Sequence, residues 1–453
     1  MNKPWIQVSL CVPLLVLPFA CTKSVRTQET ATAAQPTAAA PLAAQPGDCS
    51  QGGGCAGSTC LTSITSSAAT LPTAACPAHG EAQGGADVFS WNSFIALNWP
   101  ATAQCTADTS KSILNVTSGA QGPVVWQTQM ASDDVFIAPG SSPAGWCQGA
   151  STTALFKKQP QSLKHVAKAA SAAHALGGKF AAIAEPTGVE AVGGVVTDQS
   201  GHWLRFERYM NQIEYNAIVK NSWYKLQVLD GLSSITLPAG SVELKAAWKV
   251  LTPQEVASTR YYTTVATVYN SPEGAPSPGP NPVTLGLVGL HIIQKTPQQP
   301  GFFWSTFEQV DNDSVFFNPS SNTAPNTQTA KQPFSELNPD GSPHNVSTQI
   351  KRVNSVPADQ ALNEYYQKLL GNSVFRFYRL VSTQWQFGGA PQGRPPNVAN
   401  IVIETYVQSV SVPLNAQQPN GPQVTGCLGC HLNATAANNK TTTDHSFLFL
   451  EAK

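Results

Sequence analysis

The chain of 453 residues carries 26 basic and 26 acidic side chains, so its formal net charge is zero and only 11% of its residues are charged. This balance gives no electrostatic basis for binding nucleic acid or an anionic membrane surface, and we expect no nucleic-acid partner. Hydrophobic residues make up 42% of the chain, enough for a sizeable core. The 34 glycines and 35 prolines favour turns and strands over long solvated helices.

The first residues have the pattern of an export signal. An apolar run over residues 6–19 follows Lys3, is too short to cross a bilayer comfortably and ends in small residues, which predicts a signal peptide over residues 1–20. Residues 17–21, Leu-Pro-Phe-Ala-Cys, resemble the lipobox of bacterial lipoproteins, with the aliphatic residue one position further from the cysteine than usual. That resemblance implies that Cys21 is lipidated and that a lipid anchor attaches the protein to a membrane. The alternative is that Cys21 merely lies near an ordinary cleavage site.

Two regions separate the signal from the folded body. Residues 21–48 are mainly Ala, Pro, Thr and Gln, a composition that cannot offset the entropy cost of ordering, and they predict a disordered tether. Residues 49–86 are rich in Cys, Gly and Ser and predict a loop region. Apart from the cysteines assigned to the signal, the lipid and the C-terminal motif, the chain has Cys49, Cys55, Cys60, Cys76, Cys105 and Cys147. An even number in an exported chain indicates disulfides and an oxidising compartment, the periplasm or the outer cell envelope, and we predict that Cys105 pairs with Cys147.

Residues 87–420 predict an α+β body that is rich in strands, with an antiparallel sheet and several short helices. Apolar residues recur at helical spacing from Asp87 until Pro100, and we expect their aromatic side chains to lie in the core. Further helices are predicted over 161–176, 211–228 and 358–370, strands over 242–249, 261–269, 283–295, 302–310 and 401–412, and loops over 271–282, 318–345 and 386–399. The runs 283–295 and 302–310 predict a hairpin whose first strand is apolar on both faces and therefore central in the sheet.

The C-terminal segment, residues 421–453, contains Cys427-Leu428-Gly429-Cys430-His431, the C-x-x-C-H signature of c-type haem attachment. Two thiols at this spacing add to the two haem vinyl groups, and the adjacent histidine binds the iron. The motif predicts one haem c bonded to Cys427 and Cys430 with His431 as the proximal ligand. The alternative is an ordinary C-x-x-C disulfide beside a histidine that binds nothing.

The position of the motif excludes the small all-helical cytochrome c fold, because no methionine follows His431 before the end of the chain. The body must therefore supply most of the haem pocket. The candidates for the sixth iron ligand are Met130, Met210 and the histidines His79, His165, His174, His202, His291, His344 and His445. His291 is the most informative, as a distal ligand or a pocket residue, because it lies in an otherwise apolar strand where an imidazole needs a partner.

The remaining candidates have simpler explanations. We expect His445 to lie on a solvent-exposed tail, and Met130 and Met210 to be core residues. Three carboxylates lie beside aromatic or apolar residues and are candidates to line a haem pocket, or else to be solvated or paired: Glu214, Glu243 and Glu308. The sequence selects no catalytic residue among them.

The placement of the motif near the end of a strand-rich chain resembles the cytochrome P460 and cytochrome c′-beta family, which also ends with an acidic residue and aromatic strand residues, here Asp444-His445-Ser446-Phe447-Leu448-Phe449. The body is similar to large uncharacterised bacterial proteins of the cytochrome c family, in three stretches: residues 91–100, 289–293 and 303–308. This second resemblance covers most of the body and implies no substrate.

Three hypotheses follow. The first is an electron-transfer cytochrome of the bacterial envelope that meets a redox partner protein. The second is a haem enzyme, an oxidoreductase, or a gas-binding protein of the P460 kind that takes a small inorganic substrate such as hydroxylamine, nitric oxide or peroxide. The third is a structural lipoprotein without haem.

Overall fold

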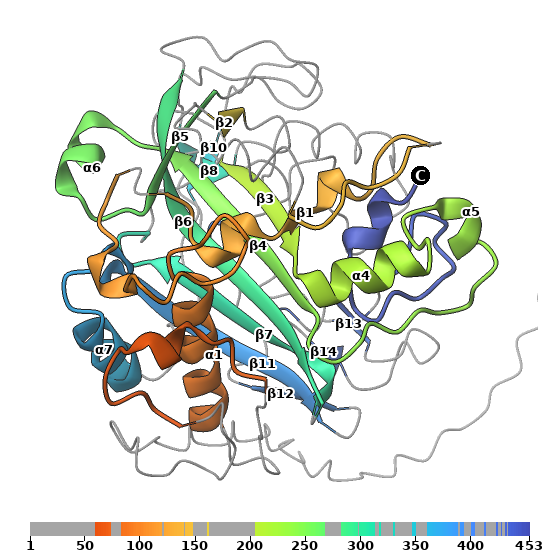
Figure 1. Cartoon of the computed structure of the whole chain (residues 1–453), viewed down its shortest axis with the longest axis horizontal. Coiled ribbons are helices and arrows are strands. Elements are labelled where there is room, and N and C mark those ends of the chain that lie inside the picture. The colour runs from red at the N-terminus through yellow and green to blue at the C-terminus, as the bar shows by residue number, and fades with distance from the viewer. Residues whose placement is uncertain are drawn as a thin grey trace, which may run out of the picture. The chain divides into compact units, whose positions relative to one another are not determined.

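The computed structural model describes nine longer stretches, residues 59–73, 83–119, 122–139, 141–147, 204–267, 282–297, 299–312, 360–387 and 434–453 (Figure 1). It also describes short pieces at 161–162, 317–318, 329–330, 347–349, 390–393, 400–403, 412–413, 423–424, 427 and 431–432. The predicted signal peptide (1–20) and tether (21–48), with Cys21, lie outside these residues, and so does Cys430. The chain divides into two compact units, Met1–Ala43 and Ala44–Lys453, and all described residues belong to the second. None of the helices in the described stretches is long and apolar enough to span a membrane.

A nine-stranded sheet forms the centre of this unit. Its main path is β1 (Met130–Ala131), β3 (Arg205–Met210), β4 (Val242–Val250), β6 (Val283–Thr296), β7 (Gln299–Gln309), β11 (Tyr378–Phe387) and β12 (Ala390–Gly393), each antiparallel to the next. β5 (Thr263–Thr267) pairs with the first residues of β6 and runs parallel to β2 (Gln161–Ser162). The predicted α+β fold with an antiparallel sheet is confirmed. So is the central position of residues 283–295, because β6 has partners on both sides.

The other elements are short. The helices are α1 (Gln83–Leu97), α4 (Gln212–Lys220), α5 (Leu226–Leu229), α6 (Pro253–Ser258) and α7 (Gln360–Leu369), and the 3-10 helices are η1 (Ser66–Ala69), η2 (Ile113–Asn115), η3 (Val125–Thr128), η4 (Ser132–Asp134), η5 (Val374–Phe377) and η6 (Leu448–Glu451). A small sheet contains β8 (Phe317–Asn318), β9 (Thr329–Ala330) and β10 (Ser347–Gln349), and β13 (Val412–Pro413) pairs with β14 (Gln423–Val424).

Helix α1 covers one face of the sheet, as Figure 1 shows. Trp91 and Phe94 pack on Phe307 of β7, with ring centroids 5.1 and 4.3 Å apart. The Ser90 hydroxyl lies 2.7 Å from the hydroxyls of Ser305 and Thr383, so the polar side chains buried between helix and sheet also find partners. The predicted helix and the core position of its aromatic residues are both confirmed.

The opposite face of the sheet carries a second core cluster. Consecutive strand residues point to opposite faces, so the direct cross-strand neighbours Ile293 and Trp304 lie away from Phe307 and α1. They pack with residues of α4 and of the C-terminal segment, among them Phe449. Met130 and Met210 are buried in the same cluster, as expected for core residues. This face positions the segment that follows the C-x-x-C-H motif.

The single helix predicted over 211–228 is instead two helices, α4 and α5. Ser222 adopts a left-handed conformation, with φ of 56°. The N–H groups of Ser222 and Trp223 then donate back to the carbonyls of Val219 and Ile218, at 3.1 and 2.9 Å. This pattern of bonds ends a helix, and apolar periodicity alone does not reveal it.

Other predicted boundaries also differ. The strand predicted over 401–412 begins with a buried turn at 401–403, closed by the N–H of Ile403, which donates to the carbonyl of Asn400 at 3.1 Å. The Glu308 carboxylate accepts the N–H of Ile401 at 3.0 Å. Gln161–Ser162 form β2 rather than the start of a helix, and 163–176 lie outside the described residues. The loops predicted over 318–345 and 386–399 contain residues of β8, β9, β11 and β12. The stretch 444–449, for which the resemblance implies a strand, is a turn followed by the start of the 3-10 helix η6.

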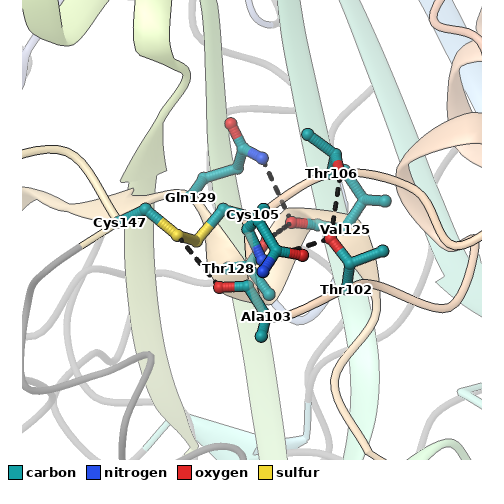
Figure 2. Close-up of a disulfide and its surroundings, with 9 residues drawn as sticks. Thr102, Ala103, Cys105, Thr106, Val125, Thr128, Gln129 and Cys147 are labelled. Atoms are coloured by element: carbon teal, nitrogen blue, oxygen red, sulfur yellow. Dashed lines mark hydrogen bonds between the residues drawn. A yellow bond between two sulfur atoms is a disulfide. The ribbon is translucent and has the colours of Figure 1, made fainter.

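Cys105 and Cys147 form a disulfide, as predicted (Figure 2). The backbone around Cys105 is held in a tight turn, in which its N–H donates to the carbonyl of Thr102 at 3.2 Å. The bond joins two positions 42 residues apart and ties the stretch after α1 to residue 147. Cys60 is also disulfide-bonded.

Candidate functional site

His431, the histidine of the motif, is held by the segment that follows it. Its Nδ1 lies 2.7 Å from the backbone carbonyl oxygen of His445. Because a carbonyl oxygen only accepts, Nδ1 carries the hydrogen and the lone pair of the neutral ring is on Nε2. Ligand histidines of metal sites are typically oriented in this way, by a hydrogen bond from the nitrogen that does not bind the metal.

The contact between the two histidines is reciprocal, because Nδ1 of His445 lies 3.3 Å from the carbonyl oxygen of His431. The expectation that His445 is exposed on a tail is therefore wrong: the residue is half-buried and packs against the sheet. Burial lowers the pKa of His445, which favours its neutral form. Asp444 and His445 both have positive φ, 52° and 71°, and this turn directs the His445 carbonyl at His431.

Aromatic side chains surround the two histidines. The ring of Trp304, on β7, lies 5.8 Å from the imidazole of His431 and 5.8 Å from that of His445, measured between centroids. Phe447 lies 4.9 Å from His431 on the same measure. Cys427, the first cysteine of the motif, is partly buried and packs on the same cluster as Trp304. The first cysteine and the histidine of the motif are thus both placed against one apolar face of the sheet.

The carboxylate of Asp444 fixes this segment to the sheet. It accepts the N–H of Leu237 at 2.8 Å and forms an ion pair with Lys295 of β6. A second ion pair joins Arg208 of β3 to Glu451 of η6. Because all four charged side chains are largely shielded from solvent, these contacts hold the segment more firmly than exposed pairs would.

Two carboxyl groups lie side by side beneath the segment. Glu214 of α4 is 0% exposed and Glu243 of β4 is 5% exposed, and each interacts with the other. Burial raises the pKa of Glu214 well above its usual range, and the neighbouring Glu243 raises it further. Burial likewise raises the pKa of Glu243, to about 7, although a hydrogen bond from the Ser446 hydroxyl opposes the shift. Two of the three carboxylates selected from sequence therefore come together here.

The other selected residues lie elsewhere on the sheet. Glu308 is fully buried, but its partners are the N–H of Ile401 and the guanidinium of Arg379. His291 is 6% exposed on β6, two residues before Ile293, and therefore lies on the same face as Trp304. It is placed on the sheet face that carries His431.

Several candidates fall outside the part of the chain that the structure describes: His79, His165, His174, His202 and His344, with Cys21 and Cys430. Among the described residues, no three His, Cys, Asp or Glu side chains are grouped so as to hold a metal ion. A haem iron does not need such a group, because the porphyrin supplies four of its ligands.

Comparison with protein-family models, curated proteins and solved structures finds no match to this chain. The fit of a haem therefore rests on the residues themselves. His431 presents the tautomer that an iron ligand needs, with apolar rings beside it and Cys427 four positions earlier on the same surface. These residues fit a covalently attached haem.

Sequence reasoning missed two features of this site. The first is the role of Trp304, which the pattern of β7 presents only as one more buried aromatic residue. The second is the pairing of Glu214 with Glu243. The one available signal was Asn211 three residues before Glu214, a helix-start pattern in which the acid normally turns back to the cap. Here the Asn211 N–H bonds to the carbonyl of Val242 instead, and the Glu214 side chain is buried.

Proposed function

We propose that this protein is an envelope c-type cytochrome that carries one haem, bonded to Cys427 and Cys430, with Nε2 of His431 on the iron, and that it transfers electrons to or from a redox partner protein. The observation that carries the proposal is the hydrogen bond between His431 Nδ1 and the His445 carbonyl, at 2.7 Å. It orients a histidine whose sequence position already marks it as a haem ligand.

When bound, the haem supplies a one-electron couple whose potential depends on its axial ligand and its surroundings. The protein supplies the surroundings of the iron ligand. His431 is held in one tautomer, the rings of Trp304 and Phe447 pack beside its imidazole, and the ion pair of Lys295 with Asp444 keeps the segment on the sheet. A rigid, apolar ligand environment lowers the reorganisation that accompanies a change of charge.

The compartment is part of the same proposal. The signal-like N-terminus and the pattern before Cys21 support export and a lipid anchor. The disulfide between Cys105 and Cys147 supports an oxidising compartment, in which attachment of haem to a C-x-x-C-H motif also takes place.

A test of covalent attachment uses the full chain, expressed in a bacterial host that has cytochrome c maturation machinery. Haem-dependent peroxidase staining on a denaturing gel should mark the mature protein, because only a covalent haem survives unfolding. Cys427→Ala with Cys430→Ala should abolish the stain, and His431→Ala should abolish or strongly reduce it. The matched control, Cys105→Ser with Cys147→Ser, removes another cysteine pair and should keep the stain. A wild-type protein that accumulates without staining would refute the proposal and favour a structural lipoprotein.

A second candidate, a haem enzyme or gas-binding protein of the P460 kind, is favoured by one observation. The buried carboxyls of Glu214 and Glu243 titrate above their usual range, as the acid–base groups of many enzymes do. A high-spin visible spectrum that changes on addition of cyanide or nitric oxide would support this candidate. A low-spin spectrum that neither ligand alters would support electron transfer.

A further inference from the structure

The paired carboxyls of Glu214 and Glu243 need a proton. Among the described residues, no N–H or O–H donor reaches either side-chain oxygen of Glu214 or Oε1 of Glu243. A carboxylate only accepts hydrogen bonds, so two ionised groups in contact would repel each other and leave these oxygens unsatisfied. One proton shared by the pair turns one carboxyl into a donor for the other, which removes the repulsion and satisfies two of these oxygens.

The charges around the pair balance each other. Lys295 of β6 faces it together with its partner Asp444, and Arg208 of β3 faces it together with its partner Glu451. These two cations and two carboxylates add no net positive charge that would hold both Glu214 and Glu243 in the ionised form.

The pair is connected to His431 through consecutive residues. The Ser446 hydroxyl bonds to the carboxyl of Glu243 and the Ser446 oxygen accepts the N–H of Leu448 at 3.2 Å. The residue before it, His445, bonds through its carbonyl to Nδ1 of His431. A change of charge at the ring of His431 is thus separated from the carboxyl pair by one short turn of chain, in a buried region where charges are poorly screened.

We infer that Glu214 and Glu243 form a buried proton site that releases a proton when the haem carried by His431 is oxidised, and takes one up when it is reduced. The inference rests on the proposed function. With haem bound, oxidation would send one electron to the redox partner while the carboxyl pair would lose one proton to water, so the net charge of the buried region would not change. The protein then transfers an electron together with a proton.

The sign of the coupling follows from linkage. An ionised carboxyl pair stabilises the oxidised, more positive iron, so the reduction potential should fall as the pH rises through the titration of the pair. The steepest slope, one proton for each electron, is about 59 mV for each pH unit. Glu243→Gln should flatten the slope over the neutral range, and Glu214→Gln with Glu243→Gln should do the same. The matched control Glu308→Gln changes a buried carboxylate that has its own donors and should keep the wild-type slope.

A measurement independent of the potential is infrared spectroscopy of the haem-loaded full chain. The wild type should show the carbonyl band of a protonated carboxylic acid, which shifts in heavy water and is lost or shifted in Glu243→Gln but not in Glu308→Gln. In the oxidised-minus-reduced difference spectrum of the wild type the acid band should decrease on oxidation, and this needs no variant.

The outcomes separate the two proposals. A chain that has the acid band but takes up no haem contradicts the proposed function and the coupling with it. A chain that carries covalent haem yet lacks the acid band overturns the further inference alone. So does a potential that does not change with pH, or a slope that survives unchanged in both glutamine variants.

Discussion

Glu214 and Glu308 are both fully buried acids, and their surroundings differ in one respect. Glu308 receives a backbone N–H and faces a guanidinium, whereas the neighbour of Glu214 is a second carboxyl. Hydrogen-bond donors offset the cost of burying Glu308, whereas a proton on the carboxyl pair offsets the cost of burying Glu214. The partner of a buried acid, more than its depth, decides its charge.

The carboxyl pair should make the stability of the protein depend on pH. The pKa of Glu243 is raised from 4.5 to about 7 in the folded state, so the folded protein binds more protons than the unfolded chain between these values. The contribution of Glu243 to the free energy of unfolding is therefore fully present below pH 4.5. It is lost as the pH rises to about 7, a loss on the order of 3 kcal/mol at most. Urea unfolding at a series of pH values should show the fall in the wild type.

Glu243→Gln should flatten that dependence, because an amide does not titrate. The matched control is Glu364→Gln on the exposed side of α7, which should keep the wild-type dependence. Identical pH profiles in the wild type and Glu243→Gln would show that Glu243 titrates as it does in the unfolded chain.

His291 is expected to line the haem pocket, because it is buried on the sheet face that carries Trp304 and the segment of His431. His291→Ala should shift the Soret band or raise the affinity for cyanide. Gln294→Ala is the control, since Gln294 lies on the same strand but bonds to Ser93 on the α1 side. A spectrum and a cyanide affinity that stay at wild-type values in His291→Ala would count against a place in the pocket.

At this scale the sequence identified the chemical groups but not their contacts. Local pattern was sufficient for the core positions of Met130 and Met210. It was insufficient for His445, because the bonds that bury this residue come from a left-handed turn and from a strand more than 100 residues away. The Glu214–Glu243 contact joins a helix and a strand whose pairing no short-range pattern encodes.

Helices and strands whose apolar residues recur at one clear spacing were predicted well. Strands that bury polar side chains were not. Helix α1, the β6–β7 hairpin and α7 match their predictions within a few residues. No strand was predicted at β3, because Glu207 and Arg208 place one charged residue on each face and this pattern is typical of a solvated segment. Both have buried partners, the Trp248 indole and Glu451. β11 carries a polar run, Ser382 to Gln384, which is buried against α1 and β7.

The disulfide between Cys105 and Cys147 should contribute substantially to stability. It closes a loop of 42 residues, and loss of this restraint on the unfolded chain corresponds to about 4 kcal/mol in the chain-entropy model. Cys105→Ser with Cys147→Ser should therefore lower the free energy of unfolding by about 2–4 kcal/mol, measured by denaturant titration. An unchanged midpoint would mean that the unfolded chain is already restrained in this region.

For the whole molecule, the proposed lipid anchor on Cys21 is a prediction that can be tested directly. If Cys21 is acylated, metabolic labelling with a palmitate analogue should tag the wild-type protein and not Cys21→Ser, because the thiol is the site of modification. Cys11→Ser, within the predicted signal peptide, is the control and should keep the label. Equal labelling of the wild type and Cys21→Ser would contradict the anchor.

The arrangement of α1 against the sheet has a consequence for folding. Almost every residue of this helix is buried, yet many of the groups that bury it come much later in the chain: the partners of Ser90 are 215 and 293 residues away, and the carbonyl bound by Gln83 is 300 residues away. Contacts of such long range form slowly, whereas the β6–β7 hairpin can close early. A chain emerging from its N-terminus must therefore hold an apolar helix without the sheet that covers one of its sides until most of the protein has followed. We expect folding to begin at the hairpin, and α1 to depend on a chaperone during that delay.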